Sequence, residues 1–173
     1  MTWTDDNSRF THVFLQKSKA ETFEKFKNFE AWLLNQHGRN VGMLHSDRGG
    51  EYTSTEFDKY LANKGIKRSL TAHDTPEHNG VAERLNYTLA NLVRSMLIGS
   101  LCPKSLWGFA LLYATWLKNR IPCKALESEE KTPYEMVYGE KPDLTRAREW
   151  GCKVFVWLPK PTLHLKPCYK SQT

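Results

Sequence analysis

Two acidic residues, Asp47 and Glu83, have the types and the spacing needed for metal chemistry. Asp47 follows residues 41–46, which predict a short buried strand, and Glu83 lies near the start of residues 80–98, which predict a helix. Thirty-five residues, 48–82, separate the two acids. An acid at a strand end and an acid in the first turn of a helix can converge on one divalent cation. Oxygen ligands with open coordination positions suit Mg²⁺ or Mn²⁺ bound to phosphate.

Each acid also has an ordinary structural explanation. Asp47 followed by Gly49 and Gly50 can form a simple turn, since glycine lets the backbone turn without obstruction by a Cβ atom. A glutamate such as Glu83 is favoured in the first turn of any helix by the helix dipole. Two histidines, His73 and His78, are alternative metal ligands in a predicted polar loop over 71–79, although lone loop histidines are more often solvated. Only the spacing of the acids and the motifs around them favour metal binding.

The composition indicates one intracellular domain with a polyanionic partner. The chain has 173 residues, and its aromatic content of 12% is ample for a core. The formal charge is +6, from 25 basic and 19 acidic residues, which favours a polyanionic partner without proving one. The four cysteines, at 102, 123, 152 and 168, form no Cys-x-x-Cys pair, so we expect free, mostly buried thiols in a reducing compartment. No signal peptide and no membrane-spanning run is recognisable, which indicates a soluble protein.

Hydrophobic periodicity and turn chemistry predict alternating strands and helices. The first predicted helix carries an aromatic stripe of Phe23, Phe26 and Phe29, which favours core packing over a base-stacking surface. The predicted elements are a hairpin that turns at 5–9 into a strand over 10–15, an amphipathic helix from 18 or 19 to about 36, strands over 41–46 and 66–70, a short helix with a Thr53–Glu56 capping box that ends before Gly65, a helix over 80–98, a helix over 105–119 capped by Ser105, a helix with a Thr132–Glu135 capping box that ends at Gly139, and a strand over 153–158. We expect residues 159–173 to be poorly ordered.

Several separated segments resemble the integrase core of retroelements, and that of copia-type retrotransposons in particular. In the order of that family they are Ser46-Asp47-Arg48-Gly49-Gly50-Glu51-Tyr52, Thr75-Pro76-Glu77-His78-Asn79-Gly80-Val81-Ala82-Glu83-Arg84, Asn119-Arg120-Ile121-Pro122, Lys131-Thr132-Pro133-Tyr134-Glu135 and Trp150-Gly151-Cys152. The resemblance covers nearly the whole chain. It implies an α/β, ribonuclease-H-like fold, with a mixed five-stranded sheet flanked by helices on both faces.

The resemblance also implies which residues do the chemistry. The catalytic set of the family is Asp, Asp, Glu, and Asp47 and Glu83 match its last two members. Its first Asp lies on an opening strand that would precede Met1, and Asp5 and Asp6 resemble turn acids of the family rather than metal ligands. We therefore expect a fragment of a Pol polyprotein that lacks the first strand and has little or no strand-transfer activity alone. The expected layout is a truncated core over 1–100, a helical extension over 101–148, and the start of a small β-barrel-like segment over 149–173.

The implied partner is DNA, both the element ends and the target, with RNA as a further candidate. Because backbone binding needs cationic and amide donors, the candidate phosphate contacts are Arg84, Asn86, Arg94, Lys64 and Lys67. The implied location is the nucleus, with the cytoplasm as a second one. The helix over 105–119 is apolar on nearly every side, which fits homo-oligomerisation, as in the family, or internal packing equally well.

Two other functions fit the same residues. The first is a non-catalytic nucleic-acid-binding or protein-binding module derived from an integrase. The second is a different nuclease of the same fold, and the segments at 119–122 and 132–135 argue against it, because such a nuclease would not need them.

Overall fold

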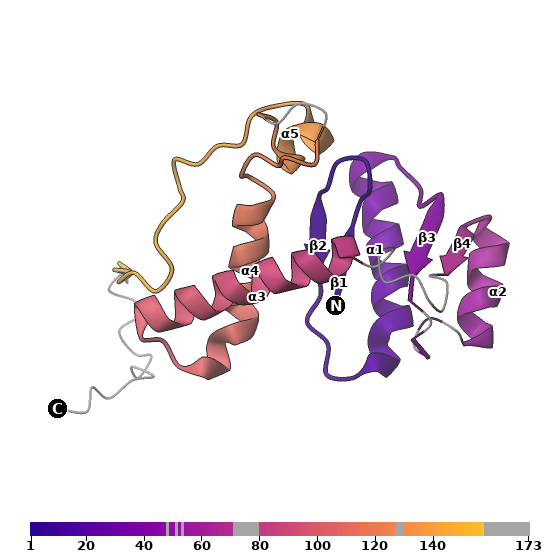
Figure 1. The fold of residues 1–173 in the computed structure, drawn as a ribbon, viewed down its shortest axis with the longest axis horizontal. Helices are drawn as coiled ribbons and strands as arrows, with labels where there is room; N and C mark the ends of the chain where they lie inside the picture. Colours follow the sequence, from indigo (N-terminus) through magenta and orange to yellow (C-terminus); the bar gives the residue numbers. More distant parts are fainter. Residues whose placement is uncertain (48, 51, 53, 71–79, 127–129, 158–173) are drawn as a thin grey trace.

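The computed structural model describes residues 1–47, 49–50, 52, 54–70, 80–126 and 130–157. Its elements alternate much as the sequence predicts (Figure 1). In chain order they are β1 (Thr2–Thr4), β2 (Thr11–Val13), η1 (Lys19–Glu21), α1 (Thr22–His37), β3 (Met43–Ser46), α2 (Thr55–Lys64), β4 (Lys67–Leu70), α3 (Gly80–Ser100), η3 (Lys104–Leu106), α4 (Trp107–Lys118) and α5 (Pro133–Tyr138). The loop expected over 71–79, with His73 and His78, lies outside the described residues.

The four described strands form two separate pairs. β1 and β2 are antiparallel, with Trp3 opposite His12, and β3 and β4 are parallel, with Leu44 opposite Arg68. The mixture of antiparallel and parallel pairing agrees with the expected fold class. The expected continuous sheet is divided, because no strand of the described chain lies between the pairs and hydrogen-bonds to both.

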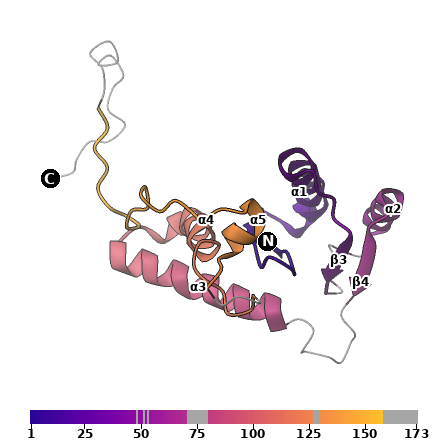
Figure 2. The same ribbon diagram turned by 90° about the horizontal axis from the view of Figure 1, so that it is seen from above.

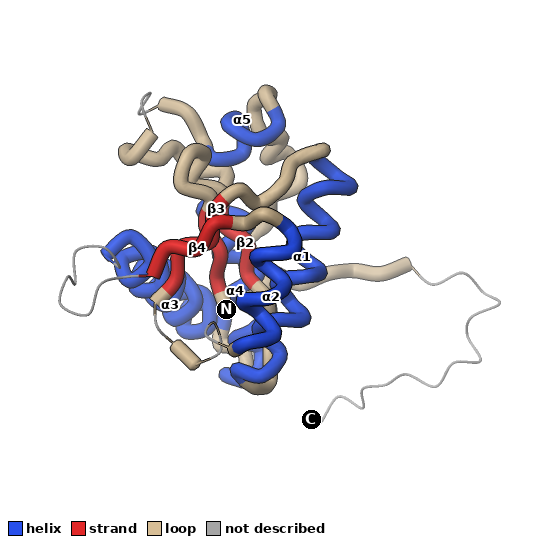
Figure 3. The backbone as a smooth tube through the Cα atoms, turned by 90° about the vertical axis from the view of Figure 1, so that its right-hand side faces the viewer, coloured by secondary structure: helices blue, strands red, loops and turns tan. Residues whose placement is uncertain are grey.

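Helices flank the strands on both sides (Figure 3). Along the molecule, α3 and α4 lie on one flank of the strand pairs and α2 lies on the other (Figures 1 and 2). The aromatic stripe of α1 joins the two pairs: the ring centroid of Phe26 lies 5.8 Å from that of Trp3 in β1 and 5.1 Å from that of Phe57 in α2. Phe26 and Phe57 are buried in one cluster that also holds Leu44 of β3. The prediction that this stripe belongs to the core is confirmed.

The helix ends follow local chemistry, with two corrections. Gly38, Gly65 and Gly139 end α1, α2 and α5 in the left-handed conformation, where glycine carries no Cβ penalty. The cap of α2 is Ser54, whose hydroxyl accepts a hydrogen bond from the Phe57 amide, whereas the predicted cap Thr53 lies outside the described residues. The prediction that Ser105 caps α4 is wrong, because η3 contains Ser105 and leads directly into the helix.

The extension after α4 returns to the strands, where the ring centroid of Tyr138 in α5 lies 6.0 Å from that of Phe10, just before β2. α5 begins with the predicted capping box, in which the Thr132 hydroxyl accepts from the Glu135 amide and the Glu135 carboxylate accepts from the Thr132 amide.

The predicted strand over 153–158 is wrong across its described part, 153–157: this segment pairs with no strand, and Phe155 is 93% exposed. Alternating side chains are not enough, since a strand also needs a neighbour to accept its hydrogen bonds.

The described cysteines are free, as expected, but not all are buried. Cys102 and Cys123 are half-buried and Cys152 is exposed, while Cys168 lies outside the described residues. Among the described helices, none is both long enough and apolar enough to cross a membrane. The proposed division at residues 100 and 148 stays a prediction.

Candidate metal and nucleic-acid site

Asp47 directly follows β3 and lies at the carboxyl end of the parallel strand pair. Leu44 is buried and anchors β3 in the core, while Asp47 itself is exposed. Its Oδ1 accepts a hydrogen bond from the backbone amide of Gly49 at 3.0 Å. This is the Asp-x-Gly turn expected from the sequence. The turn uses one carboxylate oxygen, so the structural explanation and the metal-binding explanation of Asp47 are compatible.

Glu83 lies in the first turn of α3 and is also exposed. α3 is fixed at this end by contacts with β1, where the Thr2 hydroxyl donates a hydrogen bond to Oδ1 of Asn86 at 3.1 Å. Farther along, Leu89 is almost completely buried where α3 packs against α4. The long apolar side of α3 thus holds the helix in place, and the first turn presents its carboxylate outward.

The structure brings the two acids to one cavity of about 290 Å³. β1, β3 and the start of α3 contribute most of its wall. Its lining residues are Met1, Thr2, Trp3, Gln16, Lys19, Leu44, His45, Ser46, Asp47, Tyr52, Ala82, Glu83 and Asn86. Asp47 and Glu83 thus line the same cavity, while their binding of one cation, which the spacing and the flanking motifs suggested, stays a prediction. No sequence pattern pointed to Thr2, Trp3 or Gln16, because their place in this wall depends on long-range packing.

The chemistry of this cavity fits a cation that keeps several open positions. Within the described residues, no group of three or more His, Cys, Asp or Glu side chains could hold a metal ion. Mg²⁺ is commonly bound by one or two protein carboxylates, with waters and substrate phosphates completing its octahedron. Asp47 and Glu83 fit that donor set. They do not make a closed site of protein ligands.

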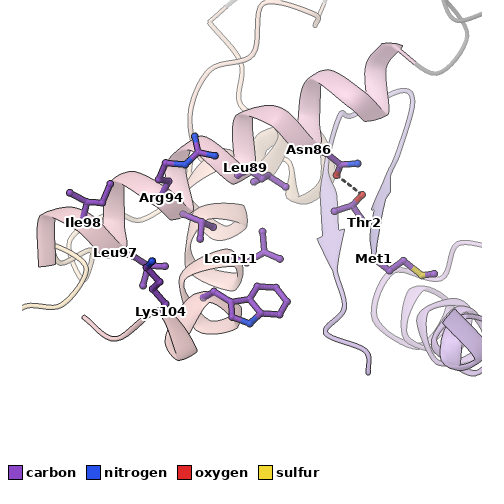
Figure 4. A pocket seen from close by; sticks show the side chains of 12 residues that line it. Met1, Thr2, Asn86, Leu89, Arg94, Leu97, Ile98, Lys104 and Leu111 are labelled. Carbon is purple, nitrogen blue, oxygen red and sulfur yellow. Dashed lines mark hydrogen bonds between the residues drawn. The ribbon is translucent and has the colours of Figure 1, made fainter. Parts of the chain in front are cut away.

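The predicted nucleic-acid contacts fall into two groups. Arg84, Asn86 and Arg94 lie on α3, which carries Glu83 in its first turn. Asn86 lines both the acidic cavity and a larger, mainly apolar cavity of about 810 Å³, which Arg94 also lines. Figure 4 shows this larger cavity between α3, α4 and the first residues of the chain, with the Thr2–Asn86 hydrogen bond at one end.

The other two candidates lie away from the acids. Lys67 opens β4 opposite Met43, whereas Asp47 follows the far end of β3. At about 3.3 Å per residue, the four positions from Met43 to Asp47 separate the level of Lys67 from Asp47 by roughly 13 Å. Lys64, at the end of α2, lies 3.6 Å from the carboxylate of the buried Glu30 and stacks on the Tyr60 ring. Arg84, Asn86 and Arg94 thus share the helix that carries Glu83, and Asn86 also lines the acidic cavity, whereas Lys64 and Lys67 lie on other elements. All five stay predictions as nucleic-acid contacts.

Relatives and solved structures agree with the motifs. The chain is 40% identical over 160 residues to the retrovirus-related Pol polyprotein from transposon TNT 1-94 of Nicotiana tabacum, a match that covers 92% of this chain and 12% of that protein. It is 30% identical over 156 residues to the Pol polyprotein from transposon RE1 of Arabidopsis thaliana, covering 90% of this chain and 10% of that protein. No protein-family model matches the chain.

The fold matches integrase catalytic cores. One is the HTLV-2 integrase catalytic core domain in complex with magnesium, with a TM-score of 0.59, 23% identity and coverage of 79% of this chain and 82% of that one. Another is the simian T-cell lymphotropic virus intasome in complex with the PP2A regulatory subunit B56 gamma, with a TM-score of 0.62, 20% identity and coverage of 85% and 51%. The chain belongs to the retrotransposon integrase core family. It spans about a tenth of the length of the curated relatives it matches.

Membership of this family confirms the expected fold class, ribonuclease-H-like α/β. As an integrase core, the chain belongs to a family of polynucleotidyl transferases. The two divided strand pairs of this integrase core are therefore a local feature of its described residues within a known architecture.

Proposed function

We propose that this integrase core contributes Asp47 and Glu83 to a Mg²⁺-dependent or Mn²⁺-dependent site for DNA strand transfer. The observation that carries the proposal is the shared cavity: two acids 36 positions apart in sequence, from a strand end and a helix start, line one space of about 290 Å³. The relation to Pol polyproteins and the magnesium complex of the HTLV-2 core support it.

In such a site the bound cation would polarise a phosphodiester and offset the charge that develops on its oxygens. The residues of this chain would hold and orient that cation. Asp47 offers the carboxylate oxygen that its turn leaves available, and the Gly49 amide fixes the carboxylate through the other oxygen. Glu83 approaches from α3, whose beginning is joined to β1 by the Thr2–Asn86 hydrogen bond. The positive end of the α3 dipole lies at the same turn and favours the anionic substrate.

The chain alone is proposed to be a poor catalyst. Two neighbouring cations repel strongly and need more than two carboxylates to hold them, and the described residues offer no group of three possible ligands. The resemblance assigns the remaining Asp to a strand ahead of Met1. We expect little or no joining of DNA ends by the purified chain with Mg²⁺ or Mn²⁺. Efficient joining would contradict this part of the proposal.

DNA is the proposed partner. Because target DNA lies in the nucleus, the nucleus is the proposed location of this integrase core. Arg84, Asn86 and Arg94 are the proposed backbone contacts, since they share α3 with Glu83. Self-association is also proposed, because the HTLV-2 core is known in dimeric and trimeric forms and α4 exposes Trp107, Phe109 and Leu112.

The metal site is tested by following the melting temperature of the purified chain during a Mn²⁺ titration. We expect Mn²⁺ to raise the melting temperature of the wild type, since a ligand that binds only the folded state stabilises it. Asp47→Asn and Glu83→Gln should each abolish the shift while leaving the metal-free melt nearly unchanged.

Glu140→Gln is the matched control, because Glu140 is an exposed acid that does not line the cavity. This variant should keep the full response to Mn²⁺. No Mn²⁺ response in the wild type would contradict the metal site and favour a binding module without catalysis. A response that survives both cavity substitutions would place the metal elsewhere.

A further inference from the structure

Tyr87 lies one helical turn beyond Glu83 on α3 and is 72% exposed. Among the described residues its side chain makes no hydrogen bond and no ring contact, which sets it apart from the many paired aromatic residues of this chain. A large aromatic side chain in water gains nothing from the fold. Its position next to the acidic cavity therefore calls for an explanation outside the folded chain.

Helix geometry places Tyr87 on a defined track. Residues four and seven positions apart lie on the same side of an α-helix, so Glu83, Tyr87 and Arg94 form one row along α3. At 1.5 Å per residue, this row is roughly 16 Å long. Leu89, which is buried against α4, lies on another side of the helix, and of this row only Arg94 borders the apolar cavity between α3 and α4. The row runs from the proposed metal site across an aromatic ring to an exposed guanidinium.

The charge of this track suits a nucleic acid. Arg84 and Arg94 are both exposed, and Glu83 is the sole acid in the sequence of α3. The Arg94 guanidinium donates to the Asn91 side chain through Nη1, at 2.9 Å, and this contact steadies it without neutralising its charge. Cations that contact phosphates, interleaved with an aromatic ring that stacks on bases, are the two components of single-strand binding surfaces.

A duplex cannot use the ring, because its bases are already stacked and paired. A base becomes available only where a strand end is unpaired. The strand whose phosphate lies at Asp47 and Glu83 would pass over the first turns of α3, where Tyr87 is the first aromatic residue after the acid.

We propose that Tyr87 is a stacking platform for an unpaired base at the end of the DNA strand bound at the acidic cavity, with Arg84 and Arg94 contacting the backbone of the same strand. The inference rests on the proposed function for its substrate, DNA, but not on metal binding or catalysis. Tyr87 sets which DNA ends bind, and the acids hold the cation.

The test compares two DNA probes that share one duplex, one blunt and one with a short 3′ overhang. Affinity is measured by fluorescence anisotropy once with Mn²⁺ and once in EDTA, so that the effect of Tyr87 is separated from that of the metal site. The wild type should prefer the overhang. Tyr87→Ala should weaken overhang binding about tenfold, within the range found for removal of one stacking residue, and leave blunt-duplex binding unchanged. Tyr87→Phe, which keeps the ring, should bind as the wild type does.

Two controls separate stacking from other causes. Ser95→Ala, another exposed position on α3, should change neither affinity. Arg94→Ala should weaken both probes and reduce the salt dependence of binding, as expected for a phosphate contact. An abasic unit in the overhang should weaken wild-type binding as much as Tyr87→Ala does, and should have no further effect on that variant.

The outcomes are distinct. Equal losses on overhang, blunt and abasic probes, or no loss at all, would overturn the stacking role. A Tyr87→Ala variant that keeps its DNA affinity but changes its oligomeric state in light scattering would also overturn it and assign Tyr87 to a protein contact. A wild type that binds neither probe would overturn the inference together with the proposed DNA contact. The Mn²⁺ titration would still decide the metal site independently.

Discussion

Two parts of this integrase core hold their polar side chains in opposite ways. At the junction of β2 and α4, Asn119 is 3% exposed; its Oδ1 accepts from the Thr11 amide at 2.9 Å and its Nδ2 donates to the Thr11 carbonyl at 2.8 Å. The Lys118 ammonium donates to the Thr11 hydroxyl at 3.0 Å. We call Thr11, Lys118 and Asn119 the β2–α4 clamp. At the acidic cavity, Asp47 and Glu83 are exposed, and within the described chain Asp47 accepts only from the nearby Gly49 amide.

The contrast between the clamp and the acidic cavity shows two roles for residues in the family-like motifs, one in stability and one in ligand binding. Asn119 belongs to one such motif, and its side chain supplies the edge of β2 with the donor and acceptor that a neighbouring strand would otherwise provide. Asp47 and Glu83 belong to others, and the fold leaves most of their oxygens to solvent. Residues of the first kind are satisfied by the protein. Residues of the second kind are available to a ligand.

The largest expected effect is at the clamp. Asn119→Ala should lower the free energy of unfolding by about 2–4 kcal/mol, because it leaves two buried backbone groups of Thr11 unpaired at roughly 1–3 kcal/mol each. Urea unfolding followed by circular dichroism measures the change. Asn63→Ala, at an exposed position in α2, is the matched control and should fall within about 0.5 kcal/mol of the wild type. A loss of unfolding free energy below about 1 kcal/mol for Asn119→Ala would show that the fold does not depend on the clamp.

A smaller effect is expected from pH at the neighbouring position of β2. Burial, with a further contribution from His37, lowers the pKa of His12 from 6.5 to about 4. Between pH 4 and 6.5 the unfolded chain binds a proton at His12 that the folded chain does not, so stability should fall as the pH drops through this window. After allowance for solvent at this half-buried ring, the loss is on the order of 1–2 kcal/mol.

Urea unfolding at several pH values would measure it, with His12→Phe as the comparison. The ring at this position lies among Phe10, Phe14, Phe29 and Trp32, so phenylalanine keeps an aromatic contact and removes the titration. The variant should lose this part of the pH dependence. Identical slopes for both proteins would show that His12 is not held neutral by the fold.

Whether a feature could be predicted from the sequence depends on the separation along the chain of the residues that interact. Capping boxes and glycine stops act within four residues, and the Thr132–Glu135 box and Gly139 stop lie where the sequence predicts. The candidate acids could be named because recognisable motifs surround them. The clamp could not be predicted, because Asn119 and Thr11 are 108 positions apart and no local pattern connects them.

The errors have the same origin. Residues 153–157 carry strand-like side chains, yet the described chain provides no neighbouring strand for them. Lys64 and Lys67 look like their fellow candidates Arg84 and Arg94 in sequence and stay predictions; only the parallel register of β3 and β4 shows that Lys67 and Asp47 lie at opposite ends of the strand pair. Ser105 has cap chemistry but lies inside η3. In each case the local sequence pattern alone was not enough, because the outcome depends on contacts with other parts of the described chain.

The smallest effect should be at the acids themselves. In EDTA, Asp47→Asn and Glu83→Gln should each change the free energy of unfolding by less than about 0.5 kcal/mol, because exposed side chains contribute little and asparagine can still accept from the Gly49 amide. The same urea series measures this. A destabilisation as large as that of Asn119→Ala would mean that the acids are held by the fold, as the clamp is, and would leave them no free oxygens for a cation. Near-neutral values together with a lost Mn²⁺ response would instead show carboxylates kept for a ligand at almost no cost to the fold.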